Sequence, residues 1–130
     1  MIDDEFIWHK KAWEEYKDWI KEKNISIVSK IIELIEDIIR NGLLKGLGKP
    51  ERLKHYKKAI YSRRITDEHR LVYDVKDDRP RILSCKAHYE KKNFDEYWKQ
   101  KISVEDMHWF FCKIVYVFDT YLIIFYSLLK

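Results

Sequence analysis

The stretch IVSKIIELIEDIIR, residues 27–40, predicts a helix with one strongly apolar side. Its apolar residues recur at intervals of three and four, which places them in one continuous stripe: Val28, Ile31, Ile32, Ile35, Ile38 and Ile39. Ser26 is a suitable N-cap, and Asn41-Gly42 supplies residues that end helices in the left-handed conformation. A helix of this kind needs a second layer of structure to cover its stripe.

Three strand-like runs further along the chain predict that layer: 59–65, 69–75 and 81–87. The polar connectors 66–68 and 76–80 are short enough for hairpins. Ahead of the helix at 27–40, residues 12–20 show the spacing of another amphipathic helix, and residues 6–8 could form an edge strand. We therefore expect an α+β fold, in which an antiparallel sheet packs against two N-terminal helices.

Length and composition limit the class of protein. The 130 residues suit one domain, and 37% charged with 15% aromatic residues is not the composition of a disordered chain. Cys85 and Cys112 lie in apolar surroundings, and no Cys/His spacing resembles a zinc site. The acidic N-terminus lacks the pattern of a secretory signal. These features predict a reduced, cytoplasmic protein without metal or cofactor.

Positive charge is concentrated in one stretch. Residues 45–64 hold eight Lys or Arg and the single acidic residue Glu51, whereas residues 1–44 are net acidic. This stretch also contains Gly46 and Gly48, which allow the backbone to turn tightly and approach a ligand. Such density suits a phosphate backbone, although a solvated loop would carry the same charges.

Side-chain parity brings candidate site residues together on one face of the expected sheet. If both connectors close hairpins, Arg64 lies opposite Arg70, and Arg70 lies opposite His88. Leu83, Cys85 and Ala87 would then point the other way, into the core. Opposed arginines destabilise a strand pair unless an anion lies between them.

Glu51 and His88 add the groups that metal-free RNA cleavage needs. At neutral pH a glutamate is a carboxylate and a histidine is partly protonated. Glu51 is therefore the candidate base for the 2′-hydroxyl, and His88 the candidate acid for the departing 5′-oxygen. A lone histidine at a strand end is often a bystander, so the shared face with two arginines matters.

Three segments resemble the Txe/YoeB toxins of the RelE-like superfamily: GKPERLKH (48–55), YSRRITDEHRLVY (61–73), and Cys85 with His88-Tyr89. The resemblance implies the toxin of a type II toxin–antitoxin pair, a ribosome-dependent messenger-RNA endoribonuclease. The implied partners are messenger RNA, the ribosome and an acidic antitoxin of the YefM/Phd kind, with operator DNA bound only through the antitoxin complex. A homodimer is also compatible.

The resemblance also implies roles for individual residues. Glu51 matches the general base, Arg70 the phosphate-stabilising arginine, His88 the general acid and Tyr89 the aromatic residue that holds the substrate. The residues expected to contact RNA are Lys49, Lys54, Arg63 and Arg64. Two alternatives stay open: a nucleic-acid-binding module without catalysis, or a degenerate toxin whose tail covers the site.

Residues 90–130 lie beyond the resemblance, which predicts a toxin domain at 1–89 and a C-terminal extension of unknown role. Within the extension, Phe94, Tyr97 and Trp98 are candidate anchors on the domain. Residues 114–129 are strongly apolar but shorter than the roughly 20 residues of a membrane span, and they contain Asp119. We expect no stable membrane span, and we expect residues 1–89 to fold and act alone.

Overall fold

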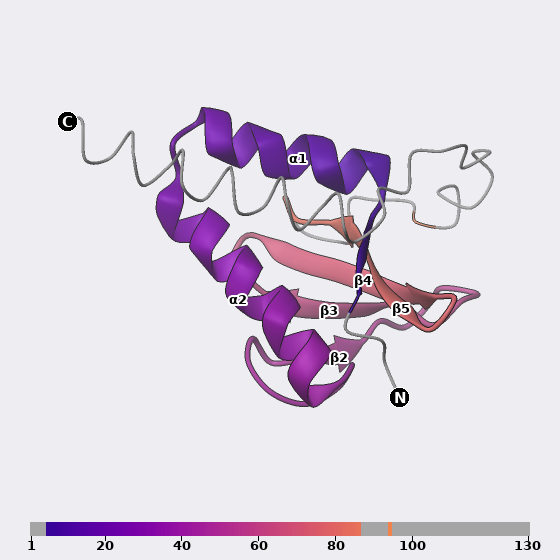
Figure 1. Ribbon diagram of the computed structural model, residues 1–130. Coiled ribbons are helices and arrows are strands. Elements are labelled where there is room, and N and C mark those ends of the chain that lie inside the picture. Colours follow the sequence, from indigo (N-terminus) through magenta and orange to yellow (C-terminus); the bar gives the residue numbers. More distant parts are fainter. Residues whose placement is uncertain (1–4, 87–93, 95–130) are drawn as a thin grey trace.

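The computed structural model describes residues 5–86 and Phe94 (Figure 1). Two helices and five strands follow in the order β1 (Ile7–Trp8), α1 (Lys10–Lys21), α2 (Ile25–Asn41), β2 (Glu51–Arg52), β3 (Tyr61–Arg64), β4 (Arg70–Lys76) and β5 (Arg79–Ser84). Both helices lie on the same side of the sheet (Figure 1). The predicted α+β class, with two N-terminal helices on a sheet, is confirmed.

The sheet is mixed, with strand order β1-β5-β4-β3-β2. The pairs β3–β4 and β4–β5 are antiparallel, as predicted; β2 pairs antiparallel with β3, and β1 pairs parallel with β5. The helical hairpin of α1 and α2 separates β1 from the other strands along the chain. The sequence analysis assigned β2 to a loop, because two residues are too few to show alternation.

Side-chain caps fix the start of each helix. The Asn24 side chain accepts a hydrogen bond from the Ile27 backbone N–H at 3.3 Å, so Asn24, and not the predicted Ser26, is the N-cap of α2. His9 caps α1 in the same way, accepting from the Lys11 N–H through Nδ1 at 3.2 Å. Gly42, with φ +92°, ends α2 as predicted.

Apolar side chains form two clusters, one on each face of the sheet. The larger cluster lies between helices and sheet, and joins Trp8, Tyr16, Ile31, Leu34 and Ile38 to Leu71, Tyr73, Ile82 and Cys85, among others. The smaller cluster lies on the helix-free face, and consists of Leu53, Ile60, Val72, Leu83 and Phe94, with Tyr56 packed against it. Phe94, predicted as an anchor of the extension, is fully buried there.

A register shift in the β4–β5 hairpin corrects two predictions. The hairpin turns at Asp77-Asp78, both with positive φ as in a two-residue type I′ turn. Tyr73 pairs with Ile82, but Val72 pairs with Ser84, so Leu83 is an extra residue. Leu83 therefore faces the smaller cluster while Cys85 faces the larger one, and the prediction that they share a face is wrong.

The predicted pairing of Arg70 with His88 involves a residue outside the described part. The register behind that prediction would set Val72 opposite Lys86, whereas the structure sets Val72 opposite Ser84. Tyr89, Tyr97, Trp98 and residues 114–129 also lie outside the described residues. Neither helix within residues 5–86 has the length and apolar character needed to cross a lipid bilayer.

Candidate functional site

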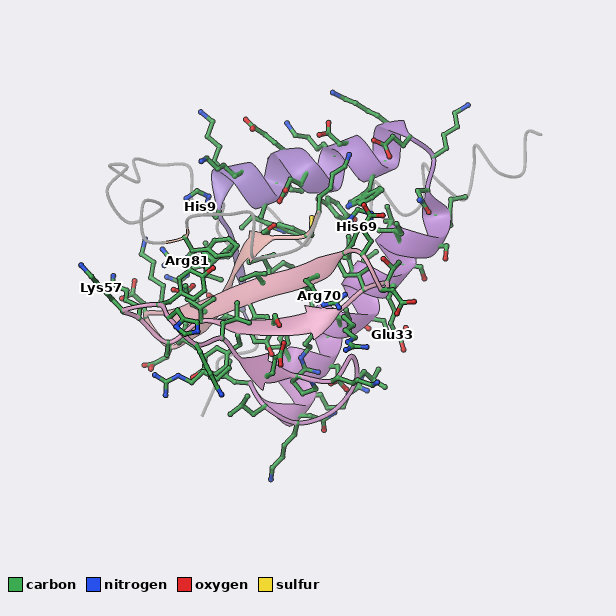
Figure 2. The ribbon with its side chains drawn as sticks, turned by 180° about the vertical axis from the view of Figure 1, so that it is seen from behind. His9, Glu33, Lys57, His69, Arg70 and Arg81 are labelled. Atoms are coloured by element: carbon green, nitrogen blue, oxygen red, sulfur yellow. The ribbon has the colours of Figure 1, made fainter. Side chains whose placement is uncertain are left out.

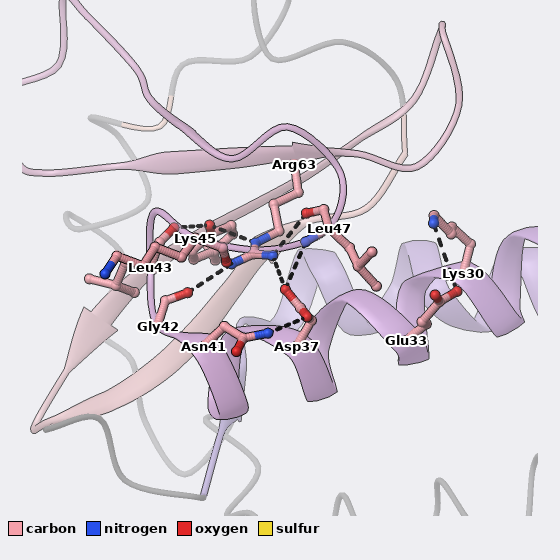
Figure 3. Close-up of polar contacts among 10 residues, drawn as sticks. Lys30, Glu33, Asp37, Asn41, Gly42, Leu43, Lys45, Leu47 and Arg63 are labelled. Atoms are coloured by element: carbon pink, nitrogen blue, oxygen red, sulfur yellow. Dashed lines mark hydrogen bonds and ion pairs between the residues drawn. The ribbon is translucent and has the colours of Figure 1, made fainter.

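Arg63 is the centre of a buried polar network that holds the loop after α2 (Figure 3). Its side chain has no exposed surface. Nη2 donates to the carbonyl oxygens of Gly42 and Lys45, each at 2.7 Å. Nη1 donates to the Leu47 carbonyl oxygen at 2.8 Å and to the Asp37 carboxylate at 2.5 Å. One side chain from β3 thus fixes the course of residues 42–47.

Asp37, on α2, is the acidic partner in this network. Its carboxylate also accepts from the Leu47 backbone N–H at 2.9 Å and from Asn41 Nδ2 at 2.7 Å. Burial alone would raise the pKa of Asp37, but the hydrogen bonds from Leu47 and Arg63 outweigh it and hold that pKa below its ordinary value. Gly46 lies against the carboxylate with φ +105°, and a Cβ there would lie 2.0 Å from Oδ2.

Tyr73, on β4, completes the network from the sheet. Its hydroxyl accepts from Arg63 Nε at 3.0 Å and donates to the Leu43 carbonyl oxygen at 2.5 Å. Burial raises the pKa of Tyr73, so the hydroxyl keeps the proton that it donates. The loop is therefore held at both ends, by Asp37 on a helix and by Tyr73 on a strand.

The chain after this loop carries Glu51 to the helix-free face. The Arg64 backbone N–H donates to the Gly48 carbonyl oxygen at 2.7 Å, just before β2 begins. Within β2, Glu51 pairs with Ser62 of β3, whose hydroxyl donates to Glu51 Oε1 at 3.4 Å. The Glu51 side chain is otherwise exposed. Its backbone is held in β2, so its carboxylate is available to a ligand on this face.

Arg64 lies directly opposite Arg70 on the same face, as the sequence predicted. Arg70 is only 8% exposed, and its Nη1 donates to the carbonyl oxygens of the β3–β4 turn, Thr66 at 2.5 Å, Asp67 at 2.9 Å and His69 at 3.3 Å. Within residues 5–86 and 94, no group accepts from Nε or Nη2 of Arg70. Figure 2 shows Arg70 at the end of the sheet where β3 leads into β4. Two arginines paired across neighbouring strands favour the binding of an anion.

Contacts with α1 fix the end of β5, from which the chain leads toward His88. Trp19 Nε1 donates to the Cys85 carbonyl oxygen at 2.9 Å. The Glu15 carboxylate accepts from the Ser84 hydroxyl at 3.0 Å and from the Cys85 N–H at 3.2 Å. Lys86 Nζ lies 4.6 Å from the centre of the Trp19 ring.

Lys86 also forms an ion pair with Glu22 at the C-terminus of α1, at 2.8 Å. The hydrogen bond to Glu22 raises the pKa of Lys86, so this clamp stays charged at neutral pH. Contacts with α1, on the other side of the sheet from Glu51, therefore fix Lys86, the residue that precedes residues 87–89.

The predicted site residues differ in how far they are exposed. Glu51, Lys49, Lys54 and Arg64 are exposed, and Arg70, which pairs with Arg64 across the two strands, is largely buried. Arg63 is fully buried, so it has no surface with which to make the RNA contact expected of it, and its role in this structure is to hold the loop. His88 and Tyr89 lie outside the described residues.

Comparison with known proteins places this fold among the toxins of bacterial type II toxin–antitoxin systems. Residues 8–89 match the family model described as the YoeB-like toxin of such a system. Because the match spans more than half of the chain, the chain belongs to the YoeB-like toxin family.

Individual relatives agree with this family. Toxin YoeB of Escherichia coli K12 is 49% identical over 83 residues, which make up 64% of this chain and 96% of that toxin. Toxin YoeB of Synechocystis is 39% identical over 80 residues, 62% of this chain and 91% of that toxin. The chain also resembles the Staphylococcus aureus YoeB dimer, with a TM-score of 0.59 and 48% identity over 65% of this chain and 95% of that one. A YoeB–YefM complex from S. aureus is also matched, with a TM-score of 0.59 and 46% identity over 68% of this chain and 99% of that one.

Proposed function

We propose that this chain is the toxin of a type II toxin–antitoxin pair and acts as a ribosome-dependent endoribonuclease on messenger RNA, without a metal ion. The observation that carries the proposal is the arrangement on the helix-free face. There the exposed carboxylate of Glu51 on β2 shares a face with Arg64 on β3 and Arg70 on β4. Membership of the YoeB-like family supports it.

In the proposed reaction, Glu51 takes the proton of the 2′-hydroxyl, and the resulting oxygen attacks the adjacent phosphorus. The bond from phosphorus to the 5′-oxygen breaks, and His88 gives that oxygen a proton. The products are a 2′,3′-cyclic phosphate and a 5′-hydroxyl end. Arg70, assisted by Arg64, stabilises the charge that develops on the phosphate oxygens.

The remaining proposed contacts surround this centre. Tyr89 holds the substrate, and the exposed lysines Lys49 and Lys54, on either side of β2, bind the RNA backbone. Arg63 takes no part in RNA binding in this proposal, because its guanidinium is occupied by the loop carbonyls and Asp37.

Purified protein supplied with ribosomes and a messenger RNA is expected to cut that RNA without any metal ion added for the protein. Analysis of the new ends should find a 2′,3′-cyclic phosphate, or the 3′-phosphate from its hydrolysis, because the 2′-oxygen is the nucleophile. A 3′-hydroxyl end would contradict the mechanism. RNA that is bound but left whole would instead favour the alternative of a non-catalytic or degenerate toxin.

We further propose that an acidic antitoxin, similar to the YefM partner of the S. aureus toxin, covers residues 45–64. Seven of the eight basic residues in this stretch are exposed, and Arg63 is the exception. An acidic chain drawn to these charges binds more weakly as salt rises. The complex would bind operator DNA through the antitoxin, and the toxin could pair with a second copy as in the S. aureus dimer.

Co-expression of the antitoxin encoded beside this chain is expected to relieve the growth arrest that the toxin causes. In vitro, the affinity of the two proteins should fall as sodium chloride is raised from 50 to 500 mM, by at least about tenfold for an interface dominated by exposed charges. Growth arrest that persists although both proteins are made would refute the pairing.

A further inference from the structure

The smaller apolar cluster lies on the same face of the sheet as the candidate catalytic residues. Val72 pairs with Ser62, and Ser62 pairs with Glu51, so the three side chains form one row across β4, β3 and β2. With neighbouring strands about 4.8 Å apart, Val72 lies about 10 Å from Glu51 along this row. Leu53, also in the cluster, is two residues from Glu51 and points to the same face.

Phe94 supplies the aromatic ring that covers this cluster. It has no exposed surface, and it packs with Leu53, Val72 and Leu83. Its ring centre lies 5.7 Å from that of Tyr56. These contacts come from β4, β5 and the loop after β2, so the ring covers part of the helix-free face.

The segment that carries Phe94 lies beyond the part of the chain that matches its relatives. The family match ends at residue 89, and the 83 matched residues cover 96% of the E. coli toxin. The family match is therefore complete without Phe94. In this chain, Phe94 covers apolar surface that the matched segment does not itself cover.

We propose that the Phe94 ring covers part of the RNA-binding face of the sheet, so that the ring in this position and a bound RNA strand exclude each other. This inference rests on the RNA-binding part of the proposed function. A phosphate held between Glu51 and Arg70 requires its flanking nucleotides to lie over adjoining parts of the same face. The Phe94 ring already covers one of those parts, directly beside the row that contains Glu51.

The proposal predicts a gain of RNA binding when the ring is removed. Full-length Phe94→Ala is expected to bind a fluorescent single-stranded oligoribonucleotide about tenfold more tightly than the unaltered protein, because the contacts of the fully buried ring no longer compete with the RNA. Methylation of every 2′-hydroxyl keeps the probe from being cut. Phe94→Leu, which retains most of the apolar contact, is the matched control and should fall between the two.

Fluorescence anisotropy at fixed salt measures this change, with thermal unfolding as the test that each variant is folded. Equal or weaker binding by a folded Phe94→Ala protein overturns the inference and leaves the proposed function standing. Failure of all three proteins to bind the probe overturns both.

A second measurement uses the unaltered chain and does not depend on the variant folding. Chymotrypsin cuts after accessible aromatic residues, so cleavage after Phe94, identified by mass spectrometry, should be slow in the free protein. A saturating concentration of the methylated oligonucleotide is expected to speed this cleavage several-fold, because bound RNA displaces the ring. An unchanged or slower rate at Phe94 overturns the inference.

Discussion

Arg70→Ala is expected to slow messenger-RNA cleavage by about 100-fold or more, the scale of losing one positioned group that stabilises charge in a transition state. Arg70 suits this role because Nη1 is anchored on the β3–β4 turn and the residue pairs with Arg64 on the helix-free face. His88→Gln should have an effect of the same order, because it removes the proposed acid. Single-turnover cleavage with ribosomes supplied measures both.

Arg40→Ala is the matched control for this experiment. Arg40 is an exposed arginine in the last turn of α2, on the helix side of the sheet, so its loss changes net charge equally without touching the helix-free face. It should cut RNA at nearly the unaltered rate. Arg70→Lys keeps the charge but not the planar fork, and should recover only part of the activity. If folded Arg70→Ala and His88→Gln proteins cut as fast as the unaltered protein, the catalytic assignment is wrong.

Asp37→Ala is expected to lower the free energy of unfolding by about 3–5 kcal/mol, the cost of removing one partner from a buried ion pair. The reason is that Arg63 would remain in the interior with its charge uncompensated, since neither side chain reaches solvent to any extent. Glu33→Ala, one helical turn earlier on the exposed side of α2, is the control (Figure 3). Its pair with Lys30 is exposed, so its loss should cost at most about 1 kcal/mol.

The pH dependence of unfolding provides a second check on Asp37. Its pKa is lowered in the folded protein, so its carboxylate contributes stability above the ordinary value of 3.8. That contribution is lost as pH falls through the lower folded pKa. Urea unfolding should therefore show a gap between the unaltered protein and Asp37→Ala that is constant near neutral pH and narrows below about pH 4. A gap that persists undiminished in acid would mean that the ion pair is not its source.

Local patterns in the sequence were sufficient for much of the fold. The stripe in residues 27–40 predicted α2, and the hairpin connectors predicted the pairing of Arg64 with Arg70. The bulge at Leu83 could not be predicted, because an inserted residue changes which face a side chain takes without changing the alternation around it.

Two features of the sequence indicate that Arg63 points into the protein, but the sequence analysis did not combine them. Adjacent residues of a strand point to opposite faces, so Arg63 and Arg64 cannot both face solvent-borne RNA on one side of the sheet. Asp37 is a carboxylate within two positions of the buried Ile35 and Ile38. Each signal alone is ambiguous, and only the tertiary contact between α2 and β3 identifies them as partners.

The loop between α2 and β2 is held mainly through its backbone, and this bears on how the sequence can change. Arg63 and Tyr73 bind carbonyl oxygens of residues 42–47, which every amino acid possesses. The loop can therefore diversify its side chains, including the exposed Leu44 and Leu47, while its path stays the same. Gly42 and Gly46 are the exceptions, because both have a positive φ and the Asp37 carboxylate also fills the space beside Gly46. The surface of this loop is thus free to adapt to a changing partner while the path that leads to β2 and Glu51 stays the same.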